Sequence, residues 1–75
     1  IMDYVVYTTT GCPKCEELKK VLRSRGIEFE VEDMSTPAAI TDLRVNGVFT
    51  LSAPVLSVGD KFYTVEELAK KGFLS

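Results

Sequence analysis

Histidine and tryptophan are absent from this 75-residue sequence, and cysteine occurs only twice, as Cys12 and Cys15. A closed zinc site takes four protein ligands, which are usually cysteines and histidines. With two cysteines and no histidine, such a site would need carboxylates or a second subunit. The composition therefore disfavours a resident metal, and it leaves the cysteine pair as the chemically distinctive feature of the chain.

The chain also lacks an excess of positive charge and long apolar segments. Nine basic and 11 acidic residues give a net charge of −2, which provides no electrostatic footprint for nucleic acid. The apolar runs are far shorter than the ~20 residues that cross a bilayer, and no charged-then-apolar leader precedes the first expected strand. We therefore expect a cytoplasmic monomer that forms one domain over residues 1–75, without nucleic-acid or membrane partners.

The two cysteines lie at a predicted junction between a strand and a helix. A β-branched run predicts a strand over residues 3–8, and this strand breaks at Gly11. Pro13 suits the first position of a helix over residues 13–24, because its missing N–H would have no partner there and its φ is already near the helical value. This arrangement places Cys12 at the N-terminus of the helix and the second cysteine within its first turn.

That position favours redox chemistry. Free backbone N–H groups and the positive end of the helix dipole stabilise a thiolate at Cys12, and the thiolate is the form that attacks a disulfide. Cys15 can then attack the mixed disulfide, which releases reduced substrate and leaves the two cysteines oxidised. Lys14 adds positive charge beside Cys12, so we expect Pro13 and Lys14 to tune the motif and the pKa of Cys12 to be lowered.

Two other uses of the cysteine pair remain open. A purely structural disulfide would remove little chain entropy, since the loop that it closes is so short. Metal handling is the main alternative, because a cysteine pair can carry Cu(I) or share zinc or an iron–sulfur cluster between subunits. In a cytoplasmic protein, however, thiols are usually reduced, and a vicinal pair is more often catalytic than structural.

The rest of the chain predicts a small α/β domain. Alternation predicts a strand over residues 27–32, and the helical crossover before it implies a parallel pairing with the first strand. Further signals predict a helix from Pro37 to about Asn46, an extended connection over 48–53, a hairpin turning at Gly59-Asp60 and a final helix capped by Thr64. The predicted element order is βαβαββα.

Three motifs together resemble the glutaredoxin family over essentially the whole chain. They are the strand that leads into Gly11-Cys12-Pro13-Lys14-Cys15, the segment Ala53-Pro54-Val55, and the helix start Thr64-Val65-Glu66-Glu67-Leu68. The resemblance implies a thioredoxin-like fold with a four-stranded mixed sheet and three helices. It also implies a cis peptide before Pro54, with the Ala53 backbone pairing with a substrate chain, and a thiol–disulfide oxidoreductase that acts as an electron carrier.

Two departures from the glutaredoxin pattern indicate which molecule donates electrons to the cysteine pair. Glutaredoxins that use glutathione usually carry Lys or Arg three residues before the first cysteine, and Gly-Gly followed by Asp before the last helix. Here Thr9 takes the first position, and Phe62-Tyr63-Thr64-Val65 stands where the glycines would be. The pattern is closer to redoxins that a thioredoxin-reductase-type flavoenzyme reduces and that serve ribonucleotide reductase or other proteins with disulfides. Glutathione is the less favoured donor, and the chemistry requires no organic cofactor.

Overall fold

The computed structural model describes residues 3–50 and 52–74. Within these residues the chain forms four strands and three helices in the predicted order βαβαββα. The elements are β1 (Tyr4–Thr8), α1 (Pro13–Ser24), β2 (Glu30–Asp33), α2 (Pro37–Val45), β3 (Val55–Val58), β4 (Lys61–Tyr63) and α3 (Val65–Lys70). The expected extended connection between α2 and β3 forms neither helix nor strand, and Leu51 within it lies outside the described residues.

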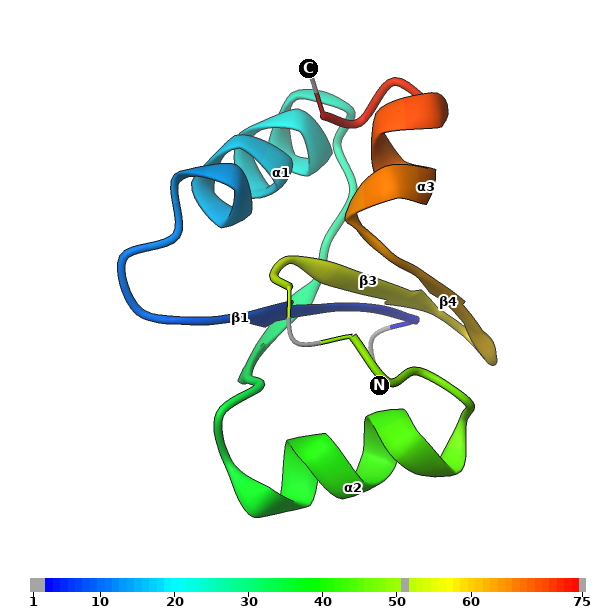
Figure 1. Ribbon diagram of the computed structural model, residues 1–75. Coiled ribbons are helices and arrows are strands. Elements are labelled where there is room, and N and C mark those ends of the chain that lie inside the picture. Colours follow the sequence, from blue (N-terminus) through cyan, green and yellow to red (C-terminus); the bar gives the residue numbers. More distant parts are fainter. Residues whose placement is uncertain (1–2, 51, 75) are drawn as a thin grey trace.

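The strands form one mixed sheet in the order β2-β1-β3-β4. β1 pairs with β2 in parallel and with β3 antiparallel, and the β3–β4 hairpin adds the second edge. The parallel pair follows from α1, since the chain must cross over the sheet before β2 can run in the same direction as β1. As Figure 1 shows, α1 and α3 cover one face of the sheet and α2 covers the other.

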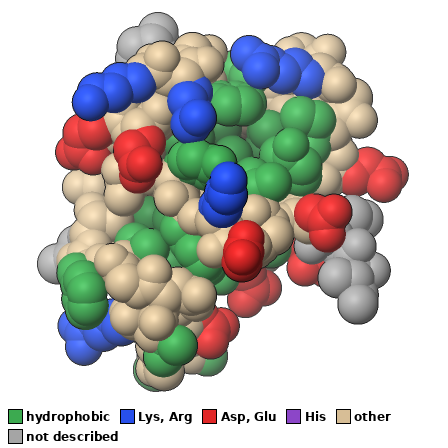
Figure 2. All heavy atoms as spheres, turned by 90° about the vertical axis from the view of Figure 1, so that its right-hand side faces the viewer, with side chains coloured by type: hydrophobic (Ala, Val, Ile, Leu, Met, Phe, Trp, Pro, Cys, Tyr) green, Lys and Arg blue, Asp and Glu red, His purple; other side chains and the backbone are tan. Residues whose placement is uncertain are grey.

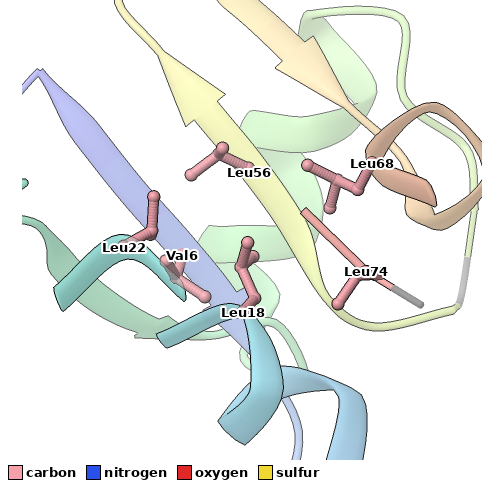
Figure 3. Close-up of a cluster of buried hydrophobic side chains, with 6 residues drawn as sticks. All are labelled: Val6, Leu18, Leu22, Leu56, Leu68 and Leu74. Carbon is pink, nitrogen blue, oxygen red and sulfur yellow. The ribbon is translucent and has the colours of Figure 1, made fainter. Parts of the chain in front are cut away.

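The core is divided between these two faces. Side chains alternate along a strand, so neighbouring residues of β1 enter different clusters. Val6 packs under α1 and α3 in the cluster of Figure 3, which consists of Val6, Leu18, Leu22, Leu56, Leu68 and Leu74. Tyr7 packs against α2 in a cluster with Met34, Ala39, Leu43, Val48 and Val55. The central strand is therefore covered on both sides, as its continuous apolar run predicts.

The second strand begins later than its sequence pattern predicts. Alternation of apolar and acidic residues indicates a strand over residues 27–32, whereas β2 spans Glu30–Asp33. Pairing with β1 starts at the Val5–Glu30 register and ends at Thr8–Asp33. Ile27 and Phe29 precede the ladder and pack against the core beside α1. The alternation of apolar and acidic residues indicates where the chain is extended, but the position of β1 decides which of these residues pair.

The face of the molecule seen in Figure 2 has an apolar area over α3 and the β4 edge. Figure 2 shows hydrophobic side chains gathered there, with Lys and Arg side chains around them. Two cations stack on aromatic rings in this part of the molecule, Lys71 on Tyr63 at 5.0 Å and Arg25 on Phe73 at 4.5 Å. Among the described residues, no helix is both long enough and apolar enough to cross a membrane.

Candidate active site

The loop between β1 and α1 positions the cysteine pair. Gly11 turns the chain with a φ of +69°, a conformation that costs glycine little. Cys12 is the N-cap of α1, and Pro13 occupies the first helical position, as predicted. The loop places Cys12 at the positive end of the longest helix of the described chain.

Cys12 and Cys15 are joined by a disulfide, with their Cα atoms 5.3 Å apart. The Cys12 Sγ also accepts a hydrogen bond from the backbone N–H of Cys15 at 3.0 Å. The two sulfur-bearing residues differ in exposure, because Cys12 is half-buried in the loop whereas Cys15 faces the core and is 1% exposed. An incoming sulfur therefore reaches Cys12 more readily than Cys15.

Charged side chains of both signs follow Cys12 along the first turns of α1. Lys14 is exposed at the second helical position. The nearby Glu16 carboxylate pairs with Lys19 at 2.8 Å. The hydrogen bond and the charge of Lys19 hold the pKa of Glu16 below its usual value. This pairing partly offsets the negative charge that Glu16 brings to the first turn.

Ala53 and Pro54 lie immediately before β3, and the peptide bond between them is cis. Pro54 is buried, whereas Ala53 is partly exposed. Tyr7, near the end of β1, pairs with Val55 at the beginning of β3, so the cysteine loop and the Ala53-Pro54 segment leave the sheet at the same end. The topology thus brings together two motifs that are about 40 residues apart in the sequence.

A groove adjoins this end of the sheet, and no local sequence pattern predicts it. We call it the α2 groove. Its volume is about 290 Å³, and it is lined by Thr9, Met34, Ser35, Ile40, Leu43, Arg44, Val48, Phe49 and Thr50. These residues come from α2 and from the segments that follow β1, β2 and α2, so only the folded chain assembles them. Thr9 connects the groove to the loop that carries Cys12.

The positions that depart from the glutathione-using pattern have other roles in this structure. Thr9 lines the α2 groove. The Lys71 ammonium lies over the Tyr63 ring. Thr64 donates its N–H and its hydroxyl to the Glu67 carboxylate, each at 3.2 Å, at the start of α3.

Within residues 3–50 and 52–74, no three Cys, Asp or Glu side chains gather in a way that could hold a metal ion.

Comparisons with known proteins agree on one family. A glutaredoxin family model matches residues 4–63. The glutaredoxin-like protein NrdH of Salmonella typhimurium is 37% identical over 60 residues, a match that covers 79% of this chain and 72% of that protein. The N-acetyl-S-hydroxy-L-cysteine reductase of Bacillus subtilis is 29% identical over 59 residues, which are 79% of this chain and 63% of that enzyme.

Solved structures give the same fold. The glutaredoxin-like NrdH-redoxin of Escherichia coli superposes with a TM-score of 0.66 at 31% identity, over 81% of this chain and 79% of that one. A glutaredoxin from Archaeoglobus fulgidus superposes with a TM-score of 0.63 at 24% identity, over 93% of this chain and 85% of that one. The first match supports family and fold, and the second supports the fold.

Proposed function

The chain belongs to the glutaredoxin family, and from that premise we propose that it carries electrons from a thioredoxin-reductase-type flavoenzyme to disulfides in other proteins. Its general activity is that of a thiol–disulfide oxidoreductase. One observation carries the proposal, namely the Cys12–Cys15 disulfide at the N-terminus of α1, with one cysteine accessible and the other buried.

The proposed cycle uses the two cysteines in sequence. The Cys12 thiolate attacks one sulfur of the substrate disulfide, so that a bond forms to Cys12 Sγ, the substrate S–S bond breaks and one substrate thiolate leaves. The Cys15 thiolate then attacks Cys12 Sγ, which releases the second substrate thiolate and closes the Cys12–Cys15 disulfide. Two electrons have passed to the substrate, and the flavoenzyme returns two electrons to the pair.

The surroundings of Cys12 support its role as the attacking group. The Cys15 N–H, 3.0 Å from Cys12 Sγ, would stabilise negative charge on that sulfur. The dipole of α1 and the exposed Lys14 act in the same direction. Cys15 is better suited to the second step, because its buried sulfur is accessible to Cys12 but not to a bulky substrate. Pro13 and Lys14 tune this reactivity.

The flavoenzyme is favoured over glutathione because the expected anchors for the charged ends of glutathione are missing. Thr9 replaces the usual Lys or Arg, and Phe62 to Val65 replace the Gly-Gly turn and its following Asp. The Escherichia coli NrdH-redoxin, which is 31% identical, is described as having a thioredoxin-like activity profile. We therefore assign glutathione a minor role as reductant.

The acceptor is proposed to be a protein disulfide, and ribonucleotide reductase is a candidate. Ala53 is partly exposed at the sheet end that also carries the cysteine loop, so its backbone is available to pair with an extended substrate segment. The cycle needs no organic cofactor in this chain. We further propose that the protein works in the cytoplasm as a single-domain monomer.

A coupled assay tests the donor and the reaction together. The protein is supplied with NADPH and insulin, with either a thioredoxin reductase or glutathione plus glutathione reductase as the source of electrons. NADPH consumption that depends on the protein is expected with thioredoxin reductase and should be small with glutathione. Equal or greater turnover with glutathione would refute the proposed donor, and no turnover with either would refute the proposed function.

A further inference from the structure

The α2 groove lies where a substrate segment bound at Ala53 would extend. The strands β1 and β2 both end at this side of the sheet, since Thr8 pairs with Asp33, and Thr9 and Met34 then enter the groove wall. Figure 1 shows the chain after α2 turning back beside that helix toward the beginning of β3. Residues 48–50 on this segment also line the groove. The groove is therefore continuous with the end of the sheet that carries the cysteine loop.

The walls of the α2 groove are mainly apolar, and part of this apolar surface is unusually exposed. Phe49, which lines the groove, is 74% exposed, and Val45, which lies at the end of α2 and outside the groove lining, is 80% exposed. Met34, Leu43 and Val48 are buried below them. Exposed large apolar side chains around a groove are typical of a surface that a partner covers. The volume, about 290 Å³, is at the lower limit of small-molecule sites and suits a single side chain.

Arg44 is the one charged residue among those that line the α2 groove. The Arg44 guanidinium forms no ion pair with a carboxylate of residues 3–50 or 52–74. The neighbouring Asp33 carboxylate instead accepts hydrogen bonds from the Ser35 N–H and hydroxyl, at 2.9 and 2.6 Å. A guanidinium beside an apolar groove complements an apolar side chain that is followed by a carboxylate.

We propose that the α2 groove binds the segment of the substrate protein next to its disulfide, with an apolar side chain between Leu43 and Phe49 and a carboxylate on Arg44. The groove thus selects disulfides that have apolar and acidic neighbours. This inference rests on the proposed function, because it assigns a specificity to the same reaction. It assigns to Arg44 and Phe49 a role in substrate selection that is separate from the chemistry at Cys12.

Peptide disulfides of defined sequence test the proposal. The probe is a seven-residue peptide with a central cysteine, a leucine on either side and an aspartate beyond each leucine, so that it can bind in either direction. Its cysteine is joined by a disulfide to 5-thio-2-nitrobenzoate, whose release is followed by absorbance. Attack by Cys12 expels this thiolate, and Cys15 then releases the peptide thiol. Companion peptides carry lysine in place of aspartate, or serine in place of leucine.

The variants compared are R44E, F49S and, as a matched charge reversal, K61E, which alters an exposed residue on the opposite sheet edge. The wild type should reduce the aspartate peptide about fivefold faster than the lysine peptide, the size of effect expected for one exposed ion pair. R44E should abolish or invert this preference, whereas K61E should retain it. F49S should reduce the preference for leucine over serine while retaining the preference for aspartate.

The disulfide of 2-mercaptoethanol, which is small and neutral, distinguishes a failure of the groove assignment from a failure of the proposed carrier function. All three variants should reduce it at the wild-type rate, since Arg44, Phe49 and Lys61 do not belong to the reacting pair. Equal rates for all peptides, or the same change in R44E and K61E, would overturn the groove assignment and leave the carrier function standing. Failure of the wild type to reduce any disulfide would overturn both.

Discussion

At the scale of single residues, the difference in exposure between Cys12 and Cys15 has the largest functional consequence. The two sulfurs are bonded to each other, yet one residue lies in a loop and the other faces the core of the sheet. The Cys12 Sγ also accepts a hydrogen bond from the Cys15 N–H at the positive end of α1. These differences assign separate steps to two chemically identical groups.

Replacing each cysteine should therefore have a different effect. C15S should still attack a peptide disulfide but should accumulate as a mixed disulfide with one peptide attached, because the second attack is lost. C12S should form no adduct and should lose at least about a thousandfold in rate. Intact-mass spectrometry after acid quenching measures both outcomes. The surface variant K20S serves as the control and should turn over normally.

The opposite pattern would contradict the proposed order of attack. An adduct on C12S and none on C15S would mean that Cys15 is the accessible nucleophile. Adducts on both variants in equal amount would mean that burial of Cys15 does not restrict access to its sulfur.

Tyr7 provides a prediction about alkaline stability. Burial raises the pKa of its phenol, and the charges of Asp42 and Glu32 raise it further. The folded state therefore holds the phenol proton more tightly than the unfolded state. Its contribution to stability is complete below a pH of about 10 and is lost as the pH rises through the folded-state pKa. The wild type should thus lose more stability than Y7F between pH values of about 9 and 11.

Urea unfolding at a series of alkaline pH values measures this difference directly. Lysine titration affects both proteins, so the comparison with Y7F isolates the contribution of Tyr7. Parallel stability curves for the two proteins would contradict the raised pKa.

At the scale of elements, the helix starts are specified by short-range chemistry. Each of the three helices begins at a residue that the sequence identifies, and two of them have proline in the first turn. Thr36 caps α2, since its hydroxyl oxygen accepts the Ala39 N–H at 3.2 Å and its hydroxyl donates to the Asp33 carbonyl at 3.0 Å. This cap fixes the start of the helix that forms one wall of the α2 groove.

Removing the cap should destabilise the protein measurably. T36A should lower the free energy of unfolding by about 1 kcal/mol, because the Ala39 N–H loses its acceptor. In a domain of this size, that loss corresponds to a fall in Tm of about 4–8 °C. T36S keeps the hydroxyl and should lie close to the wild type. Thermal unfolding followed by circular dichroism measures both variants, and equal Tm values for T36A and T36S would contradict the capping role.

The elements also mark where sequence patterns stop being sufficient. The strand–loop–helix around the cysteines and the hairpin at Gly59-Asp60 were predicted, because turn residues and proline act locally. The sequence pattern predicts the start of β2 three residues too early, because the alternation of apolar and acidic residues begins at Ile27 whereas the pairing with β1 begins only at Glu30. In α2, Ala39 and Leu43 are buried, whereas Ile40 is only partly buried, so the apolar residues of the helix do not all face the core equally.

At the scale of the whole molecule, topology brings the parts of the site together. The cysteine loop, the Ala53-Pro54 segment and the walls of the α2 groove all meet at one end of the sheet, although they come from three separate parts of the chain. The cysteine motif was evident from the sequence because its residues are contiguous. The groove was not, because its lining residues follow no common period and become neighbours only when α2 packs on the sheet.

The whole molecule also has an asymmetric distribution of charge. The strand β2 at one edge carries Glu30, Glu32 and Asp33, all exposed, whereas α1 carries most of the basic side chains of the chain's first half. An edge strand with exposed carboxylates resists pairing with a second sheet. This feature is consistent with the monomer that we propose.

A redox titration of the intact protein tests the central claim most directly. The protein is equilibrated in a series of glutathione buffers of increasing reducing power, quenched with acid and weighed by mass spectrometry. A reversible gain of two hydrogens, with no glutathione adduct at any point of the series, is the result that a Cys12–Cys15 dithiol carrier requires. A mass that stays constant across the series would contradict the redox role of the pair, and a dominant glutathione adduct on Cys12 would contradict the proposed donor.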